Sequence, residues 1–95
     1  MVMPIAFSIL TPTRNIDRIL TASTPTENGV LSYKDHGLLL CEAHVLRQRT
    51  VSVLPGEIHR EFLEDVNDLL DIGYGIPRQV KVLERIQWAY AKWLR

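Results

Sequence analysis

The chain has little of several features that would point directly to a function. Among its 95 residues it holds one cysteine, Cys41, which excludes a disulfide within the chain. Its formal net charge at neutral pH is zero. The overall field therefore does not favour nucleic acid, because phosphate binding would need a local basic patch. We expect no nucleic-acid partner and at most one compact domain.

Long apolar runs are also missing, and none approaches the roughly 20 residues of a membrane-spanning helix. The start of the chain, Met1–Leu10, is apolar over about half that length. It lacks a basic leader and a small-residue cleavage site, so we do not predict a secretory signal. Two interpretations of Met1–Leu10 stay open: the remnant of a longer hydrophobic segment, or a helical turn that packs on the core.

Motifs for catalysis are absent as well. There is no glycine-rich phosphate loop, no GxSxG and no HExxH. Cys41 and His44 are three residues apart and could share a helix face. A structural zinc site, however, needs four ligands, and His36 is poorly placed on a continuous helix. We therefore predict no enzyme, no cofactor and no metal site, and a small metal-binding protein or enzyme is the least favoured alternative.

What the sequence does contain is helical periodicity after a loosely organised start. Prolines interrupt residues 1–30, which are also rich in Thr, Ser and Asn. One short helix is expected there, from Asn15 as its N-cap to about Thr21. We divide the chain accordingly: residues 1–30 form an apolar lead and linker, and residues 31–95 form the helical domain.

The first long helix is expected to begin after Ser32, which forms a capping-box pattern with Asp35, and to end before Pro55–Gly56. Its apolar side chains, within Leu38–Leu46, point to almost every side. A helix with this pattern is normally the buried one. Gly37 costs the helix roughly 1 kcal/mol relative to alanine, so we expect another helix to approach it closely.

Two further amphipathic segments carry opposite charges. The acidic one, from about Glu57 to Ile72, gathers its acids within an arc of roughly 120° opposite its apolar side. Pro77 fits the first turn of a basic, aromatic helix that continues to Leu94 and Arg95. The apolar face of that last helix is wide enough to contact two neighbours. We therefore predict an all-α protein, a small antiparallel bundle of three main helices plus a short N-terminal helix.

Trp88 does not belong to the apolar face of the last helix. Its neighbours three and four residues away are Glu84, Arg85, Ala91 and Lys92. Aromatic residues are enriched in contact surfaces, although stacking of Arg85 or Lys92 on the ring would explain Trp88 without a partner. Likewise, the basic side chains either pair with the acidic helix or meet a partner. The predicted contact surface comprises Trp88, Arg85, Lys92, Glu61, Glu64 and Asp68.

Four stretches, taken in order, resemble a known family. They are RNIDRILTAST, LSYKDHGLLLCEAHVLR, EFLEDVNDLLD and RQVKVLERIQWAYAKWL, and they lie within Arg14–Leu94. They are similar to the C-terminal part of the fungal nuclear control of ATPase protein 2 family, whose members are much longer mitochondrial membrane proteins. The resemblance implies a mitochondrial, membrane-associated location. It also implies a role in expression of mitochondrially encoded ATP synthase subunits and in mitochondrial membrane biogenesis.

The chain departs from that family because it lacks the long N-terminal region and complete membrane spans. A fragment, a truncated gene model and a short paralogue stay open as interpretations. The leading hypothesis is a non-catalytic interaction module that binds a protein partner or the rest of a longer homologous chain. The alternative is a membrane-interface anchor, in which Met1–Leu10 and the basic last helix bind anionic lipid. The sequence does not fix the oligomeric state.

Overall fold

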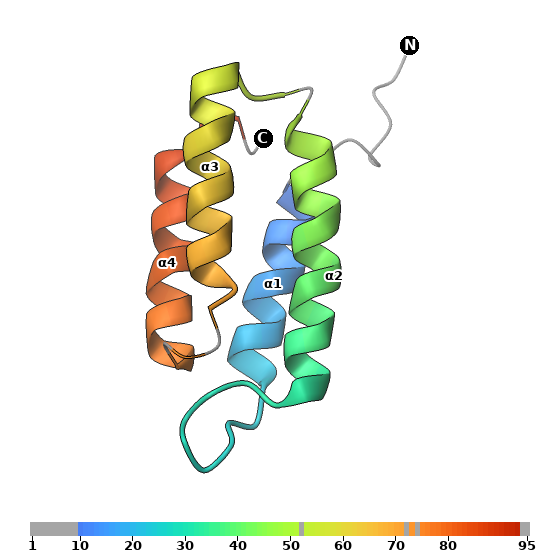
Figure 1. Ribbon diagram of the computed structural model, residues 1–95, viewed down its shortest axis with the longest axis vertical. Coiled ribbons are helices and arrows are strands. Elements are labelled where there is room, and N and C mark those ends of the chain that lie inside the picture. Colours follow the sequence, from blue (N-terminus) through green and yellow to red (C-terminus); the bar gives the residue numbers. More distant parts are fainter. Residues whose placement is uncertain (1–9, 52, 72, 74, 94–95) are drawn as a thin grey trace.

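The structure is a computed structural model that describes residues 10–51, 53–71, 73 and 75–93. These residues form four helices and no strand: α1 (Leu10–Ala22), α2 (Tyr33–Thr50), α3 (Gly56–Leu69) and α4 (Ile76–Ala89). Consecutive helices run in opposite directions along the long axis of the molecule (Figure 1). The predicted all-α antiparallel bundle is confirmed. Residues 1–9 of the apolar start, Ile72, Leu94 and Arg95 lie outside the described residues.

The first helix begins at Leu10, so the prediction that it starts at Asn15 was wrong. Pro12 lies in the first turn, where the missing N–H of a proline breaks no helical hydrogen bond. Asn15 is not an N-cap, because its side-chain amide donates a hydrogen bond to Glu42 Oε2 of α2 at 3.2 Å. Ile16 is completely buried. α1 thus packs as a full helix, against α2 and α4.

The core lies between the four helices, and every helix contributes to it. The completely buried apolar side chains are Ile16, Leu39, Ala43, Leu46, Phe62, Val66, Leu69 and Ile86. The long connection between α1 and α2 turns at Gly29, whose φ of 74° suits glycine. The carbonyl oxygen of Gly29 accepts a hydrogen bond from the N–H of Ile76 at 3.1 Å. This connection is therefore tied to the start of α4.

The start of α2 is as predicted, and the helix also ends before Pro55–Gly56, as predicted. Ser32 is the N-cap, and its Oγ accepts a hydrogen bond from the N–H of Asp35 at 3.2 Å. The helix ends at Thr50, ahead of Pro55, which instead is the N-cap of α3.

The expectation that α2 is buried on every side was wrong. Leu39 is completely buried, but Leu38 and Leu40 are 49% and 43% exposed, and Cys41 is exposed. The expected close approach of a helix to Gly37 is also not found, because a Cβ added there would meet nothing within 4 Å. α2 is therefore an outer helix with one core-facing side.

The C-terminus of α3 is held by side chains from both neighbouring helices. His36 Nε2 of α2 donates to the carbonyl oxygen of Leu70 at 3.1 Å. Gln79 Nε2 of α4, completely buried, donates to the carbonyl oxygen of Leu69 at 3.0 Å. The last carbonyls of a helix have no partner within the helix. These two side chains therefore satisfy groups that would otherwise be left unpaired.

The last helix follows its prediction at the start and stops early. Pro77 is in its first turn, and α4 packs against both α3 and α1, as its wide apolar face indicated. The helix ends at Ala89, and Tyr90 is its C-cap. Lys92 therefore lies in the turn after the helix rather than on its face. Within the described ranges, no helix combines the length and the apolar character that crossing a membrane requires.

Candidate functional site

An ion-pair cluster joins the acidic α3 to the basic α4. Arg85 Nη2 donates to Asp65 Oδ1 at 2.8 Å and lies 3.7 Å from Asp68 Oδ2. Arg78 Nη2 lies 3.7 Å from the same Asp68 oxygen. A single exposed pair contributes about 0–1 kcal/mol. Three contacts on two carboxylates mainly fix how the two helices lie against each other. Of the two alternatives for the basic side chains, Arg78 and Arg85 follow the first and pair with the acidic helix.

Asp65 also accepts a hydrogen bond from Tyr90. The Tyr90 hydroxyl donates to Asp65 Oδ2 at 2.8 Å, and its ring meets the Phe62 ring edge to face at 4.9 Å. Tyr90 is only 4% exposed. The sequence analysis did not predict this hydrogen bond. The hydrogen bond could have been predicted, because a buried tyrosine hydroxyl usually finds a partner and α3 supplies many carboxylates.

The environment of Tyr90 makes the stability of the protein sensitive to alkaline pH. Burial raises the pKa of Tyr90 well above its ordinary value, and the hydrogen bond to Asp65 raises that pKa further. In the unfolded chain the pKa is about 10. The stability contributed by neutral Tyr90 is therefore fully present below about pH 10 and is lost as the pH rises through the folded-state pKa.

We expect Tyr90→Phe to lower the free energy of unfolding by about 1–2 kcal/mol at neutral pH, because the bond to Asp65 is lost. Above about pH 10 the difference between the two proteins should shrink, because only the wild type loses the contribution of a neutral tyrosine. Urea denaturation of both proteins across this pH range measures the difference. A gap that stays constant into the alkaline range would contradict the role of Tyr90.

Trp88 is 85% exposed, as its position in the helical pattern predicted. Neither Arg85 nor Lys92, the two side chains proposed to stack on the Trp88 ring, does so. Arg85 is held by Asp65, and Lys92 Nζ lies 5.5 Å from the centre of the Trp93 ring instead. Among the described residues, no cation stacks on Trp88. A large aromatic side chain is thus presented to solvent beside a fixed arginine.

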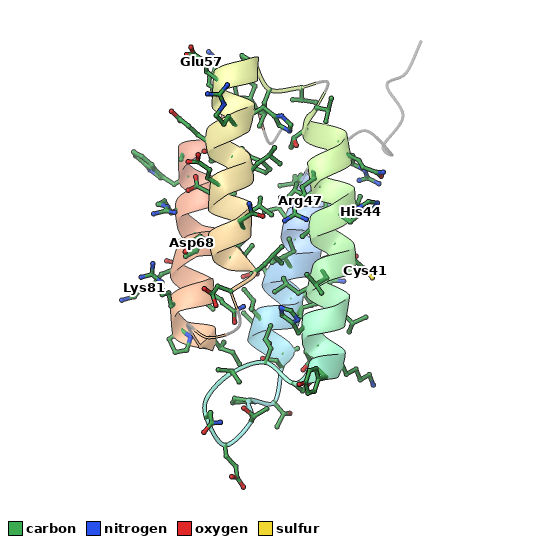
Figure 2. The ribbon with its side chains drawn as sticks, viewed as in Figure 1. Cys41, His44, Arg47, Glu57, Asp68 and Lys81 are labelled. Carbon is green, nitrogen blue, oxygen red and sulfur yellow. The ribbon has the colours of Figure 1, made fainter. Side chains whose placement is uncertain are left out.

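The remaining acids of the predicted contact surface lie on α3. Glu61 and Glu64 are exposed, as is Glu57 one turn earlier. In the part of the chain that the structure describes, none of these three glutamates forms an ion pair. Asp68 differs from them because it is already paired with Arg78 and Arg85. Figure 2 shows Glu57 and Asp68 on α3, with Lys81 pointing outward from α4. The surface therefore combines unpaired acids, an internal ion-pair cluster and Trp88.

The candidate metal ligands do not come together. His36 is bonded to the carbonyl oxygen of Leu70. Cys41 and His44 lie on the side of α2 that points away from the bundle (Figure 2). Across the described ranges, no group of three or more His, Cys, Asp or Glu is placed to hold a metal ion.

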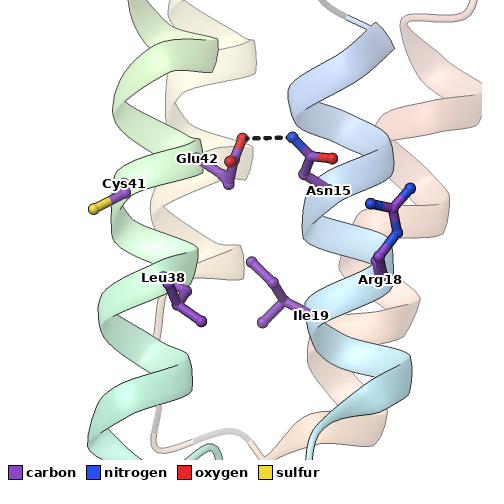
Figure 3. A pocket seen from close by; sticks show the side chains of 6 residues that line it. All are labelled: Asn15, Arg18, Ile19, Leu38, Cys41 and Glu42. Atoms are coloured by element: carbon purple, nitrogen blue, oxygen red, sulfur yellow. Dashed lines mark hydrogen bonds between the residues drawn. The ribbon is translucent and has the colours of Figure 1, made fainter.

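A shallow pocket of about 270 Å³ lies between α1 and α2. It is lined by Asn15, Arg18, Ile19, Leu38, Cys41 and Glu42 (Figure 3). The hydrogen bond from Asn15 to Glu42 crosses it, and Ile19 and Leu38 face each other below that bond. Ile19 and Leu38 form the apolar part of the lining, Asn15, Arg18 and Glu42 form its polar part, and the sulfur of Cys41 points away from α1.

One comparison with known proteins gives a match. A family model described as ATP synthase regulation protein NCA2 matches residues 4–90. This range includes all four helices and most of the predicted contact surface, but ends before Lys92. No curated protein and no solved structure matches the chain.

Proposed function

Because the chain belongs to the family of ATP synthase regulation protein NCA2, we propose that it is a non-catalytic helical module that acts in ATP synthase regulation by binding a protein partner. The partner is either another protein or the rest of a longer homologous chain. We place its action in mitochondria, at the membrane. The contact surface is the one formed by Trp88, Arg85, Lys92, Glu61, Glu64 and Asp68.

The observation that carries this proposal is the exposure of Trp88. Its ring is 85% exposed and has no stacked cation among the described residues. The adjacent Arg85 is anchored to Asp65, and Tyr90 fixes the other oxygen of the same carboxylate. The tryptophan thus projects from a surface whose neighbouring groups are already ordered. Such pre-organisation lowers the entropy cost of binding, and tryptophans are enriched among the residues that dominate binding energy.

The charges on α3, which packs against the helix that carries Trp88, suggest the chemistry of the partner. Glu61 and Glu64 are exposed acids without an ion pair in the described residues, and they lie on the helix next to Trp88. A partner with an apolar pocket for the indole ring and basic side chains nearby would complement this surface. Charge complementarity of this kind mainly sets specificity and association rate.

We expect Trp88→Ala to weaken partner binding by about 2 kcal/mol or more, which is roughly 30-fold in affinity. In cells whose encoding gene carries the change, the amount of assembled ATP synthase should differ from wild type while the level of this chain does not. Native gels for ATP synthase and immunoblots for the chain measure both. Combining Trp88→Ala with Glu64→Lys should enlarge the effect, because the new lysine would repel the basic side chains expected on the partner.

The matched control is Tyr33→Ala, which removes another exposed aromatic side chain, 95% exposed at the start of α2. It should leave ATP synthase unchanged. Arg85→Glu is a poor probe, because it would place a third carboxylate against Asp65 and Asp68. The proposed contact surface is wrong if Trp88→Ala, alone and with Glu64→Lys, gives the wild-type amount of ATP synthase.

The membrane-interface anchor is the alternative proposal. It has less support, because two basic side chains of α4, Arg78 and Arg85, are already paired with α3. Co-sedimentation with anionic vesicles separates the two proposals, since a pure protein-binding module stays in the supernatant. For the least favoured alternative, a metal protein using Cys41 and His44, stoichiometric zinc retained after dialysis would be the supporting result.

A further inference from the structure

A pocket of about 200 Å³ on α4 is lined mostly by basic side chains. Its lining consists of Arg78, Lys81, Val82 and Arg85. On a helix with 100° per residue, these four positions lie within an arc of about 100°. Val82 is the innermost of them and is only 5% exposed, so it forms an apolar floor. None of the lining residues is an acid, and the pocket therefore presents positive charge to a group that enters it.

The neighbouring aspartates of α3 leave one positive charge of this pocket unbalanced, that of Lys81. Arg85 Nη2 lies 2.8 Å from Asp65 Oδ1. Asp68 Oδ2 lies 3.7 Å from the Nη2 atoms of both Arg78 and Arg85. The two aspartates thus balance the two arginines. Lys81 is exposed and points outward from α4 (Figure 2), and in the part of the chain that the structure describes it forms no ion pair.

Glu84 is the acid nearest to Lys81 along α4, and it lies on the side of Lys81 away from the pocket. Around the helix axis, Glu84 is about 60° from Lys81 in one direction, and Arg85 is about 40° from it in the other. Glu84 does not line the pocket. A glutamate that follows a lysine along a helix also forms a weaker pair than one that precedes it. The charge of Lys81 is therefore available to a group in the pocket.

We infer that this pocket receives an aspartate or glutamate side chain of the protein partner, with its carboxylate beside Lys81. The inference rests on the proposed function, because it adds a second anchor to the contact surface around Trp88. Lys81 and Trp88 are seven residues apart on one stripe of α4, which corresponds to about 10.5 Å along the helix. The partner should therefore carry an acidic side chain about 10 Å from the apolar pocket that takes the indole ring.

The charge of the pocket on α4 favours a carboxylate over a phosphate. A carboxylate carries one negative charge, which Lys81 alone balances. A phosphate monoester carries about −1.5 to −2 at neutral pH, so part of its charge would lie unbalanced near Asp65 and Asp68. The apolar floor at Val82 also keeps water from one side of the contact, and a charge pair is stronger where water is partly excluded.

The acid of the partner also fixes the orientation in which the partner binds. Glu61 and Glu64 on α3 pair with basic side chains of the partner, whereas Lys81 on α4 pairs with an acid. A partner rotated by half a turn would bring its acid to the glutamates and its basic side chains to Lys81. Charge complementarity of this kind excludes wrong orientations and wrong partners more than it raises affinity.

The test changes the charge and the reactivity of Lys81 separately. Lys81→Glu should change the amount of assembled ATP synthase on native gels in the same direction as Trp88→Ala, because the new carboxylate repels the acid of the partner. Lys81→Arg keeps the charge and should give the wild-type amount. In isolated mitochondria, a carbodiimide should join Lys81 Nζ to an Asp or Glu of the partner through an amide bond, which mass spectrometry locates. Lys81→Arg should abolish this link, because a guanidinium does not form it.

The matched control is Lys34→Glu, which makes the same charge change at an exposed lysine of α2 and should leave ATP synthase unchanged. Immunoblots should show the wild-type level of the chain for each variant. For Lys81→Glu this is expected because the new glutamate lies three and four residues from Arg78 and Arg85 and pairs with either.

The outcomes separate this inference from the proposed function. If Trp88→Ala changes ATP synthase and Lys81→Glu does not, the proposed function stands and the inference is wrong. If neither variant changes ATP synthase, both are wrong. A wild-type chain that carbodiimide does not link through Lys81 overturns the inference whatever the variants do. Binding to anionic vesicles that Lys81→Glu abolishes, without a link to a protein, would assign the pocket to a membrane surface and also overturn it.

Discussion

Replacing Phe62 with alanine is expected to lower the free energy of unfolding by about 3–5 kcal/mol. Phe62 is completely buried, and its ring meets Tyr90 edge to face at 4.9 Å. The change removes the free energy gained by burying a large apolar side chain, and it leaves a cavity in a core shared by four short helices. It also removes the aromatic contact with Tyr90. Proteins of this size have a total of about 5–15 kcal/mol. The loss is thus a large share of the stability.

Urea denaturation followed by circular dichroism measures the effect of Phe62→Ala. In a thermal scan, the midpoint should fall by at least about 12 °C, given about 4–8 °C per kcal/mol for domains of this size. Trp88→Ala is the control, because it removes a larger aromatic ring that is 85% exposed. Its effect should stay within about 0.5 kcal/mol. Equal losses from the two changes would contradict the assignment of these rings to core and surface.

The α3–α4 hairpin shows how far the sequence can specify a candidate site. Helical angles and opposite charges predicted that α4 would pair with α3 and that Trp88 would be exposed, and both follow from local periodicity. They did not predict that Arg85 would bond to Asp65, because that depends on the relative shift and rotation of two antiparallel helices. A shift of one turn, about 5.4 Å, would bring other carboxylates to Arg85. Which carboxylate meets Arg85 therefore depends on how the buried side chains of α3 and α4 pack together.

The two errors at the start of the bundle have different physical causes. Pro12 was interpreted as an interruption, although a proline in the first turn is compatible with a helix, so the start of α1 was placed too late. α2 was expected to be buried because Leu38, Leu39 and Leu40 point in different directions. Periodicity shows which faces are apolar, but not whether the same chain covers them. Leu38 and Leu40 are partly exposed, because the other described helices do not cover them.

Ile16→Ala tests whether α1 is part of the same cooperative unit as α2–α4. Ile16 is completely buried, and α1 packs against both α2 and α4. We expect a loss of about 2–5 kcal/mol in the free energy of unfolding, with the circular dichroism of all helices lost in one transition. A loosely attached α1 would instead unfold at lower urea concentration and leave the stability of α2–α4 nearly unchanged.

Ile19→Ala is the matched control for Ile16→Ala. Ile19 is on the same helix but is only partly buried, where it lines the pocket beside Leu38. Removing the same atoms there should cost about 1 kcal/mol, because less apolar area leaves water on folding. Similar effects at the two positions would contradict the orientation of α1 in the bundle. A large loss of stability from Ile16→Ala and a small one from Ile19→Ala would show that α1 packs on the core through Ile16. The core would then include residues that precede the linker.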